Sequence, residues 1–298
     1  MKQEKQISLT ESKIDFGNQI LANILIREIM KNWNGKEIAS AQSKGGVKVV
    51  AHPFDNLIST GCDPWPPAEI IQKLYKSNHQ GHFPDEEQKI CTSGLGYYCD
   101  LQSLHSEDAI TWSIFGTVAC TNLETKRKWV ADFFRLLGLT EYVSSTRIQI
   151  FLWRRIPHPD TLVSGGPEID FGIISGDSVI LGEAKWKSGI GKAQGKKKDK
   201  DQIQLRGEFL CKYGKHVFSG AKNFAVVGLG LWDEGFQQST HDGVIFKTAL
   251  WKDVCNLQSH PHAEELRRYY DWKVRHSKFS NNELKLMNHQ EPDPSFNI

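Results

Sequence analysis

Two carboxylates and a lysine, Asp170, Glu183 and Lys185, lie between residues 166 and 186 of this 298-residue chain. After Asp170 come twelve other residues and then the triplet Glu183-Ala184-Lys185. Paired carboxylates supply the oxygen ligands that Mg²⁺ accepts, and they leave coordination positions for water and a substrate phosphate. A lysine beside such an ion can position or help deprotonate the attacking water and stabilise the charge that develops at phosphorus. The spacing therefore predicts metal-assisted hydrolysis of a phosphate ester, with Mg²⁺ as the ion and Mn²⁺ as the alternative.

A two-residue turn is predicted to bring these side chains together. Apolar runs flank the Gly-Asp pair at 176–177, and glycine at the first central position favours a type II′ hairpin. If the residues beside the turn face each other, opposed positions sum to 353, which places Asp170 opposite Glu183 (170 + 183 = 353). Lys185 then lies on the same face, two residues further along. Three ionisable groups at one end of an otherwise apolar hairpin cost free energy unless a cation or polyanion binds there.

Further helices and strands must hold this hairpin in place. Ser106 is the predicted N-cap of one helix, and a capping box at Thr121–Glu124 opens another that Gly138 ends. The first of these two helices covers residues 107–118, and further helices are predicted over residues 18–31, 68–75, 202–212 and 263–275. The predicted strands cover residues 147–153, 168–174, 179–186, 224–231 and 244–250. Helices, three strands, a helix and a strand in this order predict an α/β fold with a mixed sheet flanked by helices.

The hairpin in this setting resembles the PD-(D/E)xK nuclease superfamily, whose restriction-endonuclease-like fold has an αβββαβ core. The resemblance covers roughly residues 106–231. It implies that Asp170 and Glu183 are metal-binding acids and that Lys185 is the catalytic lysine. The residue before Asp170 is isoleucine, where the family pattern has proline.

The resemblance also implies residues on the neighbouring helices. Glu107 matches the accessory acid that many members carry on the preceding helix, which makes it a candidate catalytic and metal-binding residue. Gln204 or Gln202 matches the glutamine on the following helix. Glu168 faces Lys185 in the predicted register (168 + 185 = 353), so it could pair with the lysine or compete as a metal ligand. Whether Glu168 or Glu107 completes the metal site stays open.

The resemblance implies a Mg²⁺-dependent DNA endonuclease of restriction, repair or defence type. Two alternatives stay open: a catalytically silent nucleic-acid-binding module of the same fold, and an RNA or single-strand exonuclease. A homodimer that cuts both strands is compatible with the family. The sequence specificity and the biological process do not follow from the sequence.

A basic loop follows the lysine strand. Residues 187–200 contain six lysines and three glycines against one aspartate. Such a loop is suited to phosphate contacts, with a solvated loop as the alternative interpretation. The predicted nucleic-acid contacts are Lys187, Lys192, Lys196, Lys197, Lys198 and, from the next helix, Arg206.

Composition and the pattern of segments bear on charge, membrane insertion and domain organisation. The 37 Lys and Arg nearly balance 35 Asp and Glu, so the net charge of +2 indicates no nucleic-acid binder by itself. No stretch approaches the roughly 18 apolar residues of a membrane helix, which favours a cytoplasmic protein. The predicted divisions are an N-terminal helix with an irregular subdomain (1–104), the nuclease-like domain (105–276) and a polar, frayed tail (277–298).

The cysteines and histidines leave one metal hypothesis open. Six cysteines without a CxxC pair favour reduced thiols over a disulfide framework. His79, His82, Cys91 and Cys99, joined by Cys62, could form a zinc site in the irregular subdomain, but their spacings fit no standard finger. Scattered histidines and reduced cysteines are the alternative.

Overall fold

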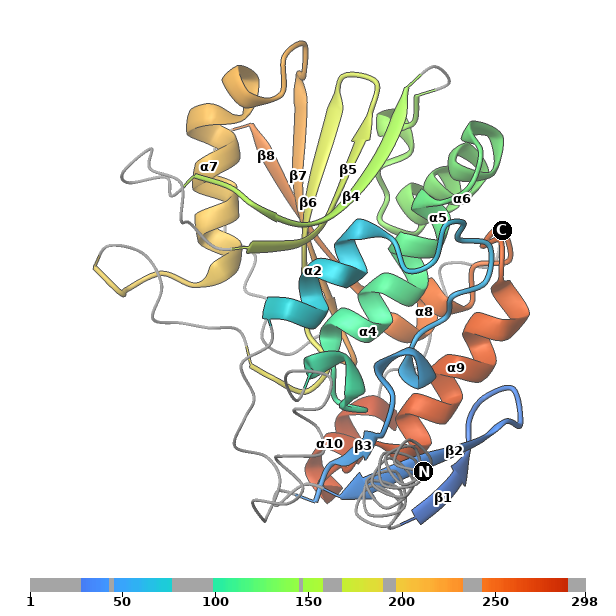
Figure 1. The fold of residues 1–298 in the computed structure, drawn as a ribbon. Coiled ribbons are helices and arrows are strands. Elements are labelled where there is room, and N and C mark those ends of the chain that lie inside the picture. The colour runs from blue at the N-terminus through green and yellow to red at the C-terminus, as the bar shows by residue number, and fades with distance from the viewer. Residues whose placement is uncertain are drawn as a thin grey trace, which may run out of the picture. The chain divides into compact units, whose positions relative to one another are not determined.

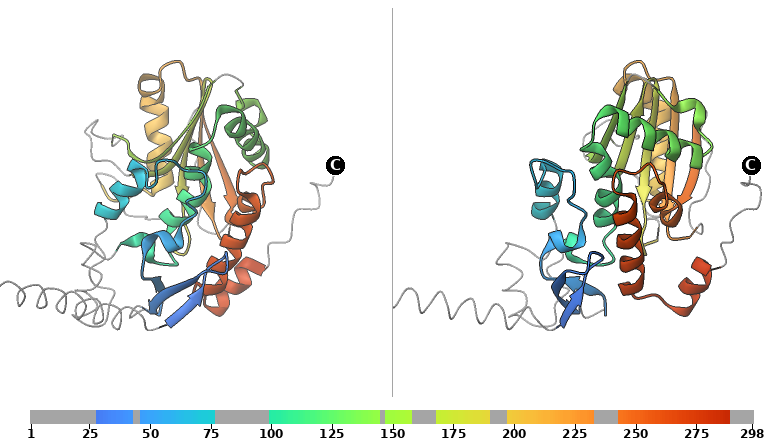
Figure 2. Two further views of the ribbon diagram at one scale, coloured as in Figure 1. Left: turned by 45° about the vertical axis from the view of Figure 1, so that its right-hand side comes forward. Right: turned by 90° about the vertical axis from the view of Figure 1, so that its right-hand side faces the viewer.

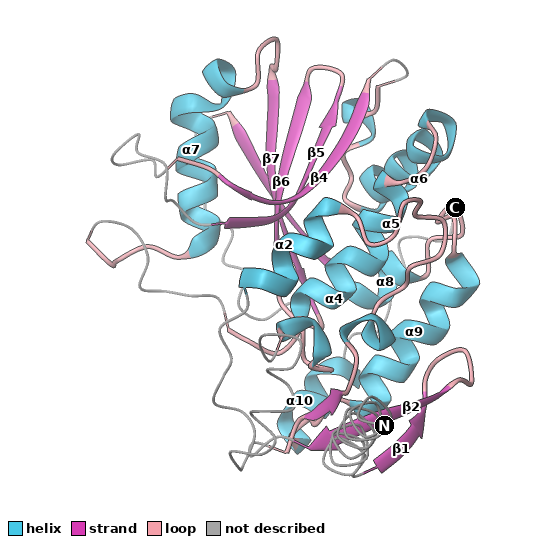
Figure 3. Cartoon of the chain, viewed as in Figure 1, coloured by secondary structure: helices cyan, strands magenta, loops and turns pink. Residues whose placement is uncertain are grey.

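The computed structural model describes residues 28–42, 46–76, 99–144, 147–157, 168–189, 197–232 and 243–288. They form an α/β fold with a mixed five-stranded sheet and an antiparallel three-stranded sheet (Figures 1 and 3). Contacts group these residues into two compact units. The first unit consists of the described residues up to Leu57, in 70–106 and in 271–278. The second unit consists of the described residues in 58–69, in 107–270 and from Phe279 onward. Within the described ranges, no helix is long and apolar enough to cross a membrane.

The first unit contains the three-stranded sheet. Its strands β1 (Glu28–Lys31), β2 (Glu37–Gln42) and β3 (Lys48–Val50) pair antiparallel in chain order. Two short helical turns, η1 (Pro53–Asn56) and η2 (Asp100–Gln102), follow in the same unit. The helix α2 (Ala68–Lys76) agrees with the short helix predicted there.

Two predictions for this region are wrong. A helix was expected over 18–31, but residues 28–31 form the strand β1, whose backbone pairs with β2. Met30 is buried and Ile29 is exposed, as in a strand with alternating sides. Residues 18–27 lie outside the described part of the chain. The stretch 36–104 is not wholly irregular, since β2 and β3 lie within it and bury Val49 and Val50.

The second unit is built on the five-stranded sheet, and its strands confirm the five predicted ones to within a few residues. They lie in the order β4 (Ile148–Arg155), β5 (Glu168–Ser175), β6 (Ser178–Ala184), β7 (Asn223–Gly230) and β8 (Val244–Leu250). The first three strands are antiparallel, and β6, β7 and β8 are parallel. The sheet is therefore mixed, as predicted.

Helices cover both faces of this sheet (Figure 2). One face carries α4 (Glu107–Thr111), the π-helical turn η3 (Trp112–Gly116), α5 (Thr117–Ala119) and α6 (Leu123–Leu136), and the other carries α7 (Gln202–Val217). The short η4 (Thr140–Tyr142) follows α6. The chain after β8 forms α8 (Trp251–Cys255), α9 (Ala263–His276) and α10 (Asn281–Asn288).

Two predicted helix signals are misplaced. The N-cap of α6 is Asn122, whose side chain accepts from the Thr125 N–H at 2.9 Å, because the Thr121 hydroxyl already donates to the Val118 carbonyl. The tail from residue 277 is not frayed throughout, since α10 covers Asn281–Asn288. Ser280 and Glu283 cap its start reciprocally, a signal that the sequence contained.

The β5–β6 hairpin has the predicted register. Ser175 pairs with Ser178 and Phe171 with Gly182, both sums being 353. Gly176 has φ +60°, as a type II′ turn requires at its first central position. The ring of Phe171 stacks on Phe115 with centroids 3.9 Å apart. It also lies against Gly182, where an added Cβ would approach it to 2.0 Å, so only glycine fits there.

Candidate active site

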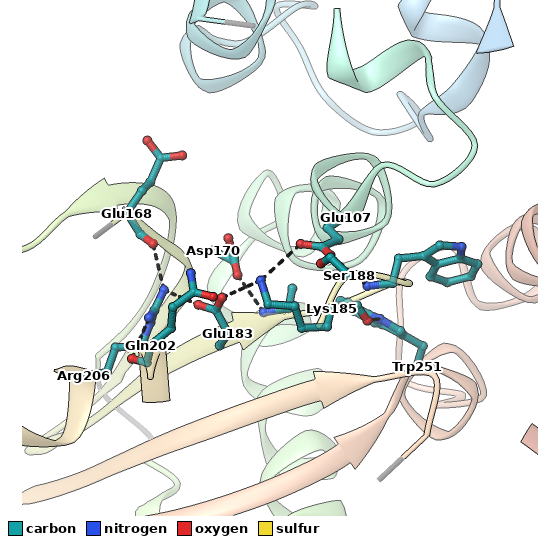
Figure 4. Close-up of polar contacts among 11 residues, drawn as sticks. Glu107, Glu168, Asp170, Glu183, Lys185, Ser188, Gln202, Arg206 and Trp251 are labelled. Carbon is teal, nitrogen blue, oxygen red and sulfur yellow. Dashed lines mark hydrogen bonds and ion pairs between the residues drawn. The ribbon is translucent and has the colours of Figure 1, made fainter. Parts of the chain in front are cut away.

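Three carboxylates and a lysine meet beside the end of β6, all within the second unit (Figure 4). Asp170 lies in β5, Glu183 lies in β6, and Lys185 follows β6 directly. Glu107 is the first residue of α4. The Lys185 Nζ is 2.7 Å from Glu183 Oε1 and 3.4 Å from Glu107 Oε2. The hairpin and α4 thus bring together the residues that the sequence separated by up to 78 positions.

The backbone of Lys185 is fixed on both sides. Its N–H donates to the Leu229 carbonyl at 2.7 Å, and its carbonyl accepts from Trp251 Nε1 at 2.8 Å. Both partners belong to packed elements, since Leu229 and Trp251 are fully buried. Only the side chain of Lys185 is left to move, so the ammonium group is directed toward the carboxylates.

Asp170 is a half-buried residue whose carboxylate charge is only partly compensated. Its Oδ2 accepts from the Ala184 N–H at 2.7 Å, which ties β5 to the end of β6. Burial raises the pKa of Asp170 to about 7, and the nearby charge of Glu183 adds to this rise. Arg206, Lys185 and the Ala184 N–H oppose it only in part. Negative charge here is therefore held at a cost.

Glu107 is held by donors from the segment after β6. Its Oε1 accepts from the Trp186 N–H at 3.2 Å and from the Ser188 hydroxyl. Burial raises the pKa of Glu107, and the neighbouring Lys185 partly offsets this rise. These bonds aim the carboxylate of α4 at the end of the hairpin.

Lys185 stays protonated in this setting. Burial by itself lowers its pKa, but the carboxylates of Glu183, Glu107 and Asp170 outweigh burial and raise the pKa above its ordinary value. A lysine in this state donates hydrogen bonds and stabilises negative charge. Its raised pKa makes it poorly suited to take a proton from water and better suited to stabilise negative charge.

Arg206 is the functional-site residue that the sequence interpretation misplaced. We expected it to contact nucleic acid, but this prediction is wrong because its side chain is 0% exposed. It forms an ion pair with Glu183 Oε2 and donates to the carbonyls of Gln202 and Glu168, each at 2.8 Å. The signal was present, because Arg206 follows Ile203 by three residues on the buried side of α7.

The other predicted polar residues lie around this core. Gln204 accepts from the Asp201 N–H at 3.1 Å in the capping box of α7, so its amide serves the start of the helix. Gln202, the alternative, contributes its backbone carbonyl to Arg206. The carboxylate of Glu168 points away from Glu183 and Lys185 (Figure 4). Of the two acids left open, Glu107 is the one that contacts the lysine.

Only part of the basic loop is described. Lys197 and Lys198 are exposed to solvent, whereas Lys192 and Lys196 lie outside the described residues. Lys187 is 3.2 Å from Glu283 Oε2 and lies over the Phe279 ring at 5.0 Å from its centroid. Its ammonium group is thus engaged by the segment that leads into α10.

The zinc hypothesis finds no support in the described part of the chain. His79, His82 and Cys91 lie outside it, and Cys62 and Cys99 are buried cysteines that form no disulfide. Among the described residues, no group of three or more His, Cys, Asp or Glu side chains is arranged to hold a metal ion.

Among the described residues no acids are gathered into a metal site, but the type of donor atom at the hairpin suits a hard divalent cation. Asp170, Glu183 and Glu107 offer only carboxylate oxygens, the ligands that Mg²⁺ prefers. Both oxygens of Glu183 face cationic side chains, Lys185 and Arg206, which explains why the carboxylates are not gathered around a common point. A nearby positive charge favours the ionised form of a carboxylate such as Asp170, whose pKa burial raises.

Comparison of the chain with protein-family models, with curated proteins and with solved structures finds no match in any of the three. The function is therefore inferred from the chemistry of this site.

Proposed function

We propose that this protein is a metal-dependent DNA endonuclease that hydrolyses phosphodiester bonds, with a restriction-endonuclease-like core of the PD-(D/E)xK type. The observation that carries the proposal is the convergence of Glu107, Asp170, Glu183 and Lys185 at one end of the β5–β6 hairpin. Two separate elements, the hairpin and α4, supply the charges. A salt-bridge cluster on an exposed hairpin would not bury them.

The order of the elements supports the same proposal. The helices α4–α6 precede β4, β5 and β6, and α7 leads into β7, which runs parallel to β6. This order is compatible with the αβββαβ order of the family core, with β8 as an additional strand at the sheet edge.

The residues of the site divide the chemistry among them. Asp170, Glu183 and Glu107 are the side chains that would hold Mg²⁺ or Mn²⁺. Such an ion lowers the pKa of bound water and polarises a phosphoryl oxygen. Lys185, kept protonated by its carboxylate neighbours, stabilises the charge that develops on the phosphate. Lys197 and Lys198 offer exposed cations for backbone phosphates of DNA.

The test is cleavage of supercoiled plasmid DNA in Mg²⁺ by the full-length protein. We expect nicking or linearisation by the native protein and a loss of at least about 100-fold in Lys185→Ala and Asp170→Asn. Asp177→Asn, at the other end of the same hairpin, is the matched control and should cut normally. Circular dichroism checks that each variant folds. Cleavage that survives both site substitutions would overturn the assignment.

A catalytically silent DNA-binding module is the second candidate. It is favoured by the pairing of both Glu183 oxygens with Lys185 and Arg206, which neutralises this carboxylate without a metal ion. Such a module should bind DNA equally in EDTA and in Mg²⁺ and never cut it. Circular and linear substrates of DNA and RNA, compared in the same assay, separate an endonuclease from the remaining candidate, an RNA or single-strand exonuclease.

A further inference from the structure

Two cysteine thiols lie against each other within the second unit. Cys62 Sγ and Cys120 Sγ are 2.7 Å apart although 58 positions separate the residues in the chain. Cys120 follows α5 and is exposed, and Cys62 lies in the segment 58–69. Both are free thiols that the proposed active site does not use.

The distance distinguishes two kinds of thiol pair. Two sulfurs that share a tetrahedral zinc ion, each bonded at about 2.3 Å, lie about 3.8 Å apart. Atoms in ordinary non-bonded contact are separated by about 3.5 Å or more. A disulfide bond measures about 2.05 Å. At 2.7 Å, the sulfurs of Cys62 and Cys120 are closer than two sulfurs that share a zinc ion, and a short movement would bring them to the length of a disulfide bond.

The two thiols also differ in reactivity. Cys62 donates a hydrogen bond to Cys120, and this bond lowers the pKa of Cys120, with a further contribution from Lys126. The same contact and burial raise the pKa of Cys62. The exposed Cys120 is therefore the better thiolate nucleophile, and Cys62 remains a thiol beside it.

We propose that Cys62 and Cys120 form a reversible disulfide when the protein meets a hydroperoxide. The Cys120 thiolate attacks one oxygen of hydrogen peroxide, the O–O bond breaks, and the hydroxide released is protonated to water. The resulting sulfenic acid is attacked by the Cys62 sulfur, the S–O bond breaks, and the hydroxyl leaves as water with the Cys62 proton. The two thiols lose two electrons, which the peroxide gains.

The disulfide would add a covalent link to contacts that already hold the segment 58–69. The Ile58 N–H donates to the Ser113 hydroxyl at 3.1 Å, and the Ile58 carbonyl accepts from Trp112 Nε1 at 3.0 Å. Both partners lie in η3, directly after the helix that begins with Glu107. Oxidation therefore restrains the segment against the helices on this face of the sheet.

The test is peroxide treatment of the reduced full-length protein, followed by thiol counting and peptide mass mapping without reductant. We expect a loss of two thiols per chain, a peptide pair joined through Cys62 and Cys120, and full recovery with dithiothreitol. The melting temperature of the oxidised protein should rise by several degrees. Cys62→Ser and Cys120→Ser should each abolish the joined peptide, and Cys211→Ser, which removes another exposed thiol, should leave it unchanged.

Three outcomes would overturn the proposal. One is a joined peptide that contains a different pair of cysteines. The second is oxidation of Cys120 to a sulfinic acid while Cys62 stays a thiol. The third is no loss of thiols at peroxide concentrations that oxidise a small-molecule thiol in the same tube. None of these results depends on whether the protein cuts DNA.

Discussion

The two ends of the β5–β6 hairpin both carry paired charges, but in opposite surroundings. At the turn, Asp177 Oδ2 is 3.3 Å from Lys222 Nζ, and the two side chains are 45% and 78% exposed. At the other end, Glu183 pairs with Arg206, and these side chains are 1% and 0% exposed. Water solvates the first pair, whereas protein atoms surround the second.

The difference shows which charges the fold requires. An exposed ion pair contributes about 0–1 kcal/mol. Burying an ion costs several kcal/mol, which its partner offsets only if the contacts are good. The hairpin itself is specified by its turn and its apolar faces, neither of which needs Asp170, Glu183 or Lys185. Charges kept where burial opposes them therefore support the proposal that the active site lies at this end of the hairpin.

Removing the buried cation should have the largest effect. Arg206→Met keeps the apolar stem of the side chain but removes the ion pair with Glu183 Oε2, so that of the two cations at Glu183 Lys185 remains. We expect a loss of about 3–5 kcal/mol in the free energy of unfolding. The double variant Arg206→Met/Glu183→Gln should recover most of this loss, because the uncompensated charge is gone. Urea denaturation of both variants measures the difference. A double variant as unstable as the single one would show that packing, and not charge, is what Arg206 supplies.

Neutralising Asp170 should stabilise the metal-free protein in a pH-dependent way. The pKa of Asp170 is raised to about 7, so its contribution to stability is present below its unfolded pKa of about 3.9 and is lost as the pH rises through 7. At pH 8, Asp170→Asn should therefore be more stable than the native protein by at most about 4 kcal/mol. The gain should shrink as the pH falls toward 4.

Thermal unfolding of both proteins in EDTA across this pH range checks the prediction. The turn variant Asp177→Asn serves as the control and should show no such trend. A gain in Asp170→Asn that is independent of pH would contradict the assigned cause.

At the turn, the backbone matters more than the charges. Gly176 has φ +60°, and an added Cβ would lie 2.8 Å from the Ser144 side chain. Gly176→Ala should therefore cost about 1–2 kcal/mol, since an L-residue is strained in this conformation. Chemical denaturation measures the cost, and Gly220→Ala, also at positive φ but in open space, isolates the share due to Ser144.

The exposed pair should have the smallest effect. Lys222→Ala removes the partner of Asp177, and we expect the free energy of unfolding to change by no more than about 0.5 kcal/mol. Raising the salt concentration should remove even this difference, because salt screens exposed charges. A loss comparable to that of Arg206→Met would remove the contrast between the two ends.

Local signals explain what could be predicted from the sequence. Gly176-Asp177 between apolar runs sets the turn type and hence the register, and that register brings Asp170 and Glu183 to one end of the hairpin. The strands of the five-stranded sheet follow from their apolar runs, since each is long enough to show its pattern. The short strand β1 could not be predicted in this way, because a run of four residues with two apolar side chains fits a helix as well as a strand.

Contacts between distant segments could not be predicted in this way. The charge of Arg206 suggested an exposed phosphate contact, but the packing of α7 on the sheet buries it against Glu183. Nothing in the spacing of Cys62 and Cys120 indicates that they meet. The choice between Glu168 and Glu107 likewise depended on where α4 lies.

The sequence by itself determined the hairpin, its register and the identity of the charges at its end, because turn chemistry and side-chain alternation act over a few residues. Only the tertiary structure decided which cations neutralise those charges and which acid joins them. Those outcomes depend on the packing of α4 and α7 against the sheet, and burial, which sets the pKa of Asp170 and the protonation of Lys185, exists only once these elements are packed.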